Sequence, residues 1–235
     1  MNPLKPRLFV GMPHPGLVTP KAAHALYVPA SPGWLAGLKV SPAANSIAPA
    51  GFNDLLALAL NLMDKGEVTH FAMIHADVEP GPAWFDALYD EMIGAGAGLI
   101  SACIAIKEPG EDPPISTAVG LIDRPRERPR RLRRADLSAL PVTFSIDDLP
   151  HGPGECLLVN TGLWAADLTH PAWDAFPGFA CDTWIEKGPD GRRASRVVPE
   201  DWAMSRWAAR NGVKVVATQA IEVFHSGLGT WGNRP

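Results

Sequence analysis

Three groups of polar side chains fall at the ends of expected structural elements: His75 with Asp77, Glu200 with Asp201, and His225. Residues two apart on an extended segment share one face, so His75 and Asp77 can point into one site. Carboxylate oxygen and imidazole nitrogen are suitable ligands for a divalent cation, and the imidazole favours Mn²⁺ somewhat over Mg²⁺. Two protein ligands are too few for a closed structural site. They suffice where a substrate diphosphate supplies further oxygens.

The elements that must position these residues alternate between strand and helix over the first 106 residues. We expect strands at 7–12, 69–74 and 98–106, a short one near 38–40, and helices at 20–27, 52–65 and from Pro82 to Gly94. This alternation predicts an α/β fold with a mainly parallel sheet covered on both faces. Ligands of such sheets bind beyond the carboxyl ends of the strands, where Pro13 and Asp77 lie.

Residues 108–153 break this pattern, because they are rich in proline and contain seven arginines between Arg124 and Arg134. We interpret them as an excursion from a single domain spanning 1–235. The arginine run is typical of a flexible arm, with capture of an anionic acceptor, lipid head groups or nucleic acid as alternatives. After the excursion we expect strands at 157–159, 213–218 and 221–224 and a helix at 200–211.

Composition narrows the class of protein. The 21 basic and 25 acidic residues give a net charge of −4, which makes nucleic acid an unlikely general partner. Three widely spaced cysteines with no C-x-x-C pair argue against a zinc knuckle or a disulfide framework, so a reducing cytoplasm is the simplest location. We expect all three to be buried thiols. The sequence shows neither a signal peptide nor an apolar run long enough to span a bilayer.

In its order of motifs, the chain resembles small glycosyltransferases of the GT-A fold. Val10-Gly11-Met12-Pro13 matches the proline-containing loop after the first strand, and Asn53 matches the Asn of an Arg-Asn pair whose Arg is here Phe52. His75-Ala76-Asp77 matches the aspartate-any-aspartate motif, with His75 in place of the first aspartate.

Later motifs follow in the same order. Asn160-Thr161-Gly162 resembles the family's Asn/Gly segment, Glu200-Asp201-Trp202 its acidic pair at a helix start, and His225 its terminal metal-binding histidine. The resemblance covers most of the chain outside the excursion. It implies a GT-A-like, Rossmann-like α/β/α sandwich.

The resemblance also implies roles for individual residues. Asp77 and His225 would hold Mn²⁺ or Mg²⁺ under the donor diphosphate, and Asp201, or second Glu200, would activate or position the acceptor hydroxyl. The donor nucleotide would contact Gly11, Pro13, His14, Asn53 and His75. The acceptor would contact Asn160, Thr161, Gly162, Trp164 and Trp202.

The predicted function is therefore metal-dependent glycosyl transfer from a UDP- or GDP-sugar to a hydroxyl of a glycan or another acceptor. A nucleotidyltransferase is a second hypothesis, although the first loop lacks a glycine-rich basic phosphate site. A third is a catalytically degenerate relative that only binds a nucleotide or glycan, which the changes at His75 and Phe52 keep open. Glu200 and Asp201 could also be a charge pair that stabilises a helix start.

Overall fold

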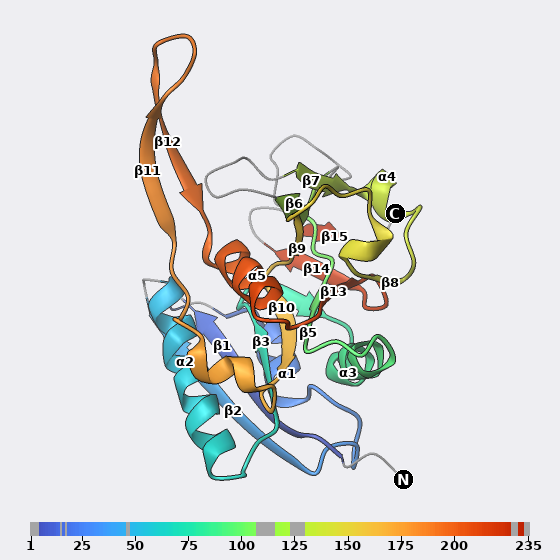
Figure 1. The fold of residues 1–235 in the computed structure, drawn as a ribbon. Coiled ribbons are helices and arrows are strands. Elements are labelled where there is room, and N and C mark those ends of the chain that lie inside the picture. Colours follow the sequence, from blue (N-terminus) through green and yellow to red (C-terminus); the bar gives the residue numbers. More distant parts are fainter. Residues whose placement is uncertain are drawn as a thin grey trace.

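The structure is a computed structural model that describes residues 5–14, 16, 18–45, 48–106, 116–122, 130–226 and 230–232. Its centre is a seven-stranded sheet in the order β2-β1-β3-β10-β5-β13-β8 (Figure 1). Five strands run parallel: β1 (Arg7–His14), β2 (Gly37–Ala44), β3 (His70–Ile74), β5 (Leu99–Ala102) and β13 (Val215–Thr218). Strands β10 (Leu163–Asp167) and β8 (Thr143–Phe144) run antiparallel to them.

Helices cover both faces of this sheet. On one face, α1 (Pro20–Tyr27) and α3 (Trp84–Gly94) share a core with Val10 and Ala72. On the other, α2 (Ala48–Asp64) and α5 (Glu200–Arg210) share a core with Phe9 and Phe71. Neighbouring strand residues thus enter opposite layers, as the pleat requires. The predicted α/β fold with a mainly parallel sheet is confirmed.

Local sequence explains where several elements begin. Thr19 caps α1, since its Oγ1 accepts a hydrogen bond from the Ala22 N–H at 3.1 Å, and Pro20 occupies the first turn. Helix α2 begins at Ala48, four residues before the predicted start. It packs closely on β1, because a Cβ placed on Gly11 would lie 3.0 Å from Leu55 Cδ1.

Three smaller sheets lie around this core. One has the order β7-β6-β9 (Arg130–Arg133, Ser116–Ile122, Cys156–Leu158), and a second the order β15-β14-β4 (Thr230–Gly232, Val223–Ser226, Val78–Pro80). The third is a hairpin of β11 (Asp182–Lys187) and β12 (Arg193–Val198), which stands away from the body (Figure 1). Short helical segments are α4 (Arg134–Leu137), η1 (Ile146–Asp148) and η2 (Pro171–Ala175).

The excursion differs from its prediction in two ways. Strand β8 comes from it, yet pairs with β13 at the edge of the central sheet and buries Phe144. The arginines from Arg130 to Arg134 form β7 and the start of α4, so a flexible arm is the wrong interpretation for them. The rest of the run, 124–129, lies outside the described residues. Within the described part of the chain, no helix is long and apolar enough to cross a membrane.

Candidate functional site

Asp77 and His225 lie side by side, although 147 residues separate them in the chain. Strands β4 and β14 form an antiparallel ladder in which His225 opposes Val78, and the Ser226 N–H donates to the Asp77 carbonyl at 2.8 Å. This pairing leaves His225 Nε2 3.5 Å from Asp77 Oδ2. The two residues predicted to share a cation therefore converge just beyond the carboxyl end of β3.

The His225 ring is held by its other nitrogen. Nδ1 lies 3.0 Å from the Ala105 carbonyl oxygen, which can only accept, so Nδ1 carries the proton. In the neutral ring, Nε2 then presents its lone pair to the Asp77 carboxylate. A backbone carbonyl that orients an imidazole in this way is common behind histidine metal ligands.

The donor set of Asp77 and His225 suits a hard or borderline divalent cation. Two metal–ligand bonds of about 2.1 Å can span the 3.5 Å between the ligand atoms. The Asp77 side chain is 46% exposed and that of His225 22%, so the pair is open to a ligand. In the described part of the chain, no cluster of three or more His, Cys, Asp or Glu side chains could hold a metal. A cation here would need oxygens from a substrate.

Glu79 lies two residues after Asp77, in β4, and has other partners. Its Oε1 accepts from the Ser226 hydroxyl at 3.0 Å, and its Oε2 lies 3.5 Å from Lys21 Nζ. These contacts tie α1 to the β4–β14 ladder. Glu79 therefore supports the ladder that positions Asp77 and His225.

The two departures from the family pattern touch each other. The rings of Phe52 and His75 lie 5.1 Å apart between centroids, and Phe52 is buried against the sheet. An aromatic pair thus occupies the two positions where the family resemblance leads us to expect an arginine and an aspartate. The contact between Phe52 and His75 therefore fixes the two rings against each other at the end of β3.

The turn Asn160-Thr161-Gly162 holds the strand ends together. Asn160 Nδ2 donates to the Ala102 carbonyl at 2.8 Å, its Oδ1 accepts from the Gly162 N–H at 2.9 Å, and the Gly162 carbonyl accepts from the His75 N–H at 2.9 Å. Asn160 and Thr161 are buried. These contacts give the turn a structural role, and its predicted contacts with an acceptor stay a prediction.

Both tryptophans predicted to contact an acceptor are covered. Trp164 lies in β10 at the centre of the sheet and is fully buried between Phe71 and Phe179. The Arg131 guanidinium lies 4.9 Å from the Trp202 ring centroid, and Trp202 is only 6% exposed. Neither indole offers a free face to a sugar in this conformation, because the protein core covers one and Arg131 the other.

Two of the predicted donor residues serve the fold. Gly11 lets α2 approach β1, and the Asn53 amide is occupied by the backbone of Phe179, with Nδ2 donating at 3.0 Å and Oδ1 accepting at 2.6 Å. Pro13 and His14 end β1 and are half-buried beside β2. They remain at the carboxyl edge of the sheet, where a ligand is expected.

Glu200 and Asp201 open α5, as predicted, and form a second acidic group. Burial, followed by the charge of Glu200, raises the pKa of the Asp201 carboxyl to about 7. The Trp202 N–H, which donates to Asp201 Oδ1 at 2.7 Å, and the Arg131 charge act in the opposite direction. Asp201 is therefore partly protonated at neutral pH, a state suited to proton transfer.

Residues that the sequence analysis did not single out border this acidic pair. The Cys181 thiol donates to Glu200 Oε2 at 3.2 Å and is exposed, which contradicts the prediction of a buried thiol. Arg131 belongs to the arginine run, which offered no signal for choosing one member. Sequence could identify neither contact, because β7 and Cys181 reach α5 only through the tertiary fold.

Hydrogen bonds join the start of α5 and the end of β3 to the same segment, Val159 to Gly162. Ser205 Oγ donates to the Asp201 carbonyl at 2.8 Å and accepts from the Val159 N–H at 3.0 Å. Val159 leads into the turn whose last residue, Gly162, receives the His75 N–H. A continuous buried segment thus runs from the start of α5 to the carboxyl end of β3.

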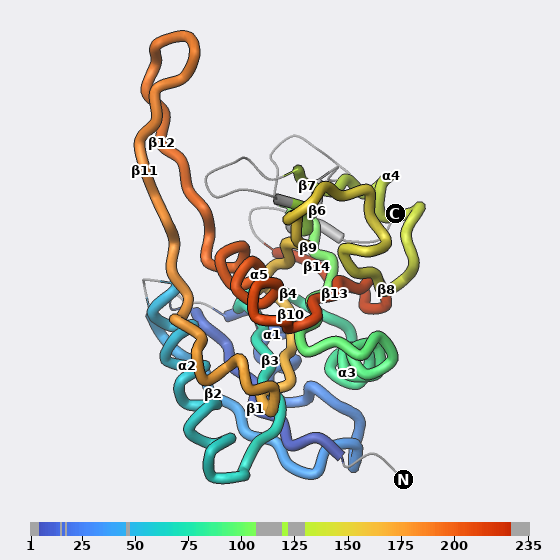
Figure 2. Tube along the Cα trace, in the orientation of Figure 1, coloured from blue at the N-terminus to red at the C-terminus, as the bar shows by residue number. Residues whose placement is uncertain are grey.

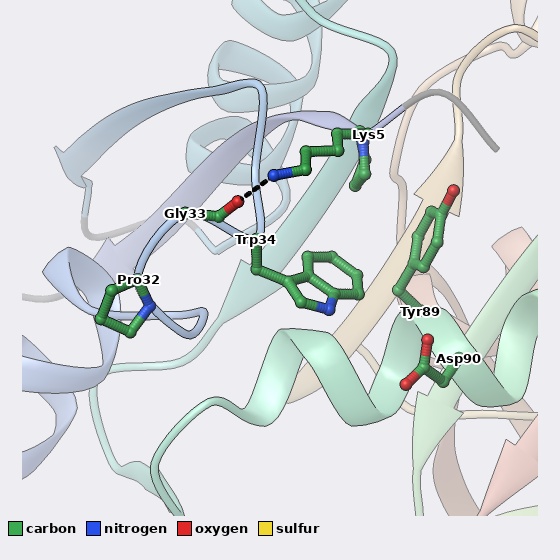
Figure 3. Close-up of a pocket in the computed structure, with 7 residues that line it drawn as sticks. Lys5, Pro32, Gly33, Trp34, Tyr89 and Asp90 are labelled. Carbon is green, nitrogen blue, oxygen red and sulfur yellow. Dashed lines mark hydrogen bonds between the residues drawn. The ribbon is translucent and has the colours of Figure 1, made fainter. Parts of the chain in front are cut away.

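Two open cavities lie away from these residues. One, of about 360 Å³, lies among Lys5, Trp34, Tyr89 and Asp90, with Lys5 Nζ donating to the Gly33 carbonyl (Figure 3). It is near the amino ends of β1 and β2, the opposite end of these strands from Pro13 and His14. The other, of about 350 Å³, lies between α1 and the segment 80–82. Neither contains a predicted site residue.

Comparison with known proteins supports the fold. No family model and no curated protein matches the chain. Among solved structures, A197 from STIV matches with a TM-score of 0.54 and 12% identity, covering 94% of this chain and 86% of A197. CMP:2-keto-3-deoxy-manno-octonic acid synthetase complexed with CTP matches with a TM-score of 0.45 and 13% identity, covering 90% and 88%. At 12% identity, the likeness to A197 extends to the fold alone.

Proposed function

We propose that this protein is a cation-dependent glycosyltransferase that moves a sugar from a nucleoside-diphosphate donor to an acceptor hydroxyl. The observation that carries the proposal is the convergence of Asp77 Oδ2 and His225 Nε2 at 3.5 Å, with the ring fixed by Ala105. Two such ligands beyond a strand end leave coordination positions for diphosphate oxygens. The family resemblance of the motif order points to the same use.

In this proposal, Asp77 and His225 hold Mn²⁺ or Mg²⁺. The cation supplies charge neutralisation for the leaving nucleoside diphosphate. Pro13 and His14 line the nucleotide at the neighbouring strand end, with His75 beside them at the ribose. The Phe52–His75 contact fixes the His75 ring by packing, since its centroid lies 5.1 Å from the phenyl ring.

Asp201 is the proposed base for the acceptor hydroxyl. A carboxylate with an ordinary pKa would be a weak base at a helix start, and burial removes that weakness by raising the pKa to about 7. Arg131, stacked on Trp202, balances the charge when Asp201 ionises. Glu200 accepts a hydrogen bond from the Cys181 thiol, and its charge helps to raise the pKa of Asp201.

A thermal-shift experiment tests the cation site. We expect one nucleoside diphosphate to stabilise the protein with Mn²⁺ but not with EDTA. At a hundredfold excess over Kd, the stabilisation is about 2.7 kcal/mol, which raises Tm by roughly 5–10 °C. Asp77→Ala and His225→Ala should each remove this increase, whereas the exposed control Asp54→Ala should keep it.

Product analysis then separates the hypotheses. Incubation with the matching nucleotide sugar should release the nucleoside diphosphate and the free or transferred sugar. Release of pyrophosphate during nucleotide-sugar synthesis would indicate nucleotidyl transfer instead. Stabilisation by a glycan with no nucleotide effect would indicate a binding module, and an unchanged Mn²⁺ effect in Asp77→Ala would show that the cation lies elsewhere.

A further inference from the structure

The β11–β12 hairpin, called the arm here, projects from the body (Figure 2). Its strands pair with each other from Asp182–Val198 to Lys187–Arg193, and no other described strand pairs with either of them. At its base, Val198 and Pro199 lead directly into the Glu200–Asp201 pair. An isolated two-stranded hairpin is marginally stable in water, so its exposed length needs an explanation.

On one face of the arm, the side chains have partners within the protein. Trp184 packs against the cluster of Cys156, Leu158, Val198 and Trp202, which anchors the base to the body. Further out, Glu186 forms an ion pair with Arg196 across the strands. Packing and charge pairing therefore account for this side, which we call the Trp face.

The opposite face has a different character. Ile185 and Val197 are 72% and 55% exposed, although both are β-branched aliphatic residues, and they alternate with exposed Thr183 and Ser195. Further out, Lys187 lies directly opposite Arg193. Like charges in opposed positions destabilise a strand pair. We call these six residues the Ile face. Stabilisation of the hairpin does not explain why these residue types occur there.

The net charge at the outer end of the arm indicates what kind of surface the Ile face would bind. The turn adds Arg192 and Asp190, which are 89% and 63% exposed and only 4.0 Å apart. With Lys187 and Arg193, the outer end has three cations and one anion, a net charge of +2 on a chain whose total is −4. Within the described part of the chain, no ion pair includes Lys187 or Arg193.

We propose that the Ile face docks on an anionic phospholipid membrane. The cations of the outer end would contact the head groups, and Ile185 with Val197 would enter the boundary between head groups and acyl chains. A second copy of the chain fits less well, because the Ile face contains no acidic residue. Two such faces packed together would offer each other no countercharge.

Sedimentation with lipid vesicles tests this proposal. The protein should bind vesicles of phosphatidylcholine with phosphatidylglycerol, bind those of phosphatidylcholine alone weakly, and dissociate in high salt. Each basic residue near an anionic surface strengthens binding roughly fivefold, so Lys187→Glu with Arg193→Glu should weaken it at least ~25-fold. Ile185→Ser with Val197→Ser should weaken it several-fold while keeping the salt dependence.

A matched pair controls for net charge. Arg7→Glu with Lys65→Glu changes the total charge equally at exposed positions outside the arm, and should reduce binding only slightly. Equal losses in both pairs, or no preference for anionic vesicles, would overturn the proposal. So would light scattering that shows a dimer which the Ile185/Val197 variant dissociates, since a second copy would then occupy the face. The arm variants should show the same nucleotide-dependent increase in Tm as the wild type. Membrane binding and the proposed function can therefore fail independently of each other.

Discussion

Replacing Asp201 by Asn should change the pH dependence of stability in a defined direction. Burial and the charge of Glu200 raise the pKa of Asp201 from 3.8 to about 7, so the folded protein binds more protons than the unfolded chain between these values. Stability of the native protein therefore falls as pH rises through this window. Asn cannot ionise, and the variant does not lose stability by this route.

The pKa values of Asp201 in the folded protein and in the unfolded chain determine how much stability changes with pH. Above pH 7, ionising Asp201 costs about 4 kcal/mol relative to the unfolded chain, since the pKa rises from 3.8 to about 7 and a tenfold change in proton affinity corresponds to about 1.36 kcal/mol. At pH 5, the cost is roughly 2 kcal/mol, because the unfolded carboxyl is already ionised but the folded one is not. Between pH 5 and pH 8, the stability difference between Asp201→Asn and wild type should grow by roughly 2–3 kcal/mol.

Urea unfolding at pH 5, 6, 7 and 8, with reductant present, measures this difference. Any constant effect of the substitution on the Trp202 N–H contact cancels, because only the change with pH is compared. Asp174→Asn is the matched control, since Asp174 is exposed, and its difference from wild type should stay flat. Under the proposed function, the variant should also lose about 10²- to 10⁴-fold in kcat for sugar transfer while keeping nucleotide binding.

A stability difference that stays constant or shrinks with rising pH would refute the environment deduced for Asp201. It would mean that the carboxyl ionises normally, as an exposed helix-start residue does. Loss of nucleotide binding together with kcat would instead assign Asp201 to the donor side of the site.

Two further predictions concern the neighbouring elements. A Cβ on Gly162 would lie 2.8 Å from Ile104 Cδ1, which is buried in the core, and 3.1 Å from Asn160 Oδ1, whose amide is fixed by hydrogen bonds. Gly162→Ala should therefore lower the free energy of unfolding by about 1–3 kcal/mol in urea, whereas Gly94→Ala, with open space, should not lower it. Although Cys181 is exposed as a residue, partial burial of its sulfur, followed by the hydrogen bond to Glu200, raises the pKa of the thiol, so Glu200→Gln should speed its alkylation by iodoacetamide at pH 8. An unchanged alkylation rate would show that the Cys181–Glu200 contact does not persist in solution.

Much of the scaffold could be predicted because its signals are local. Thr19-Pro20 sets the start of α1, and the apolar run 69–74 gives the buried strand β3. Strand β10 was missed, because a five-residue apolar segment has no periodicity that separates strand from loop. The arm was missed for a related reason, since its alternation of exposed and half-buried residues is apparent only once the strands are paired.

In the candidate site, too, the sequence predicted some features and could not predict others. The order of motifs predicted that Asp77 and His225 would share a place, and the structure brings them within 3.5 Å. The sequence did not show that Trp164 and Trp202 are buried, because an aromatic residue type does not reveal whether its face is covered. Arg131 could not be singled out from seven similar arginines, since its contact with Trp202 depends on how β7 packs over α5.

By itself, the sequence determined the residue types available for chemistry and the short-range hydrogen-bonding and apolar patterns that begin and end most helices and strands. Only the tertiary structure decided that β10 runs against its neighbours, that Ala105 holds the His225 ring, and that the pKa of Asp201 is about 7. The reason is physical: propensities and caps act within a few residues, whereas pairing, burial and local charge arise from segments far apart in the chain.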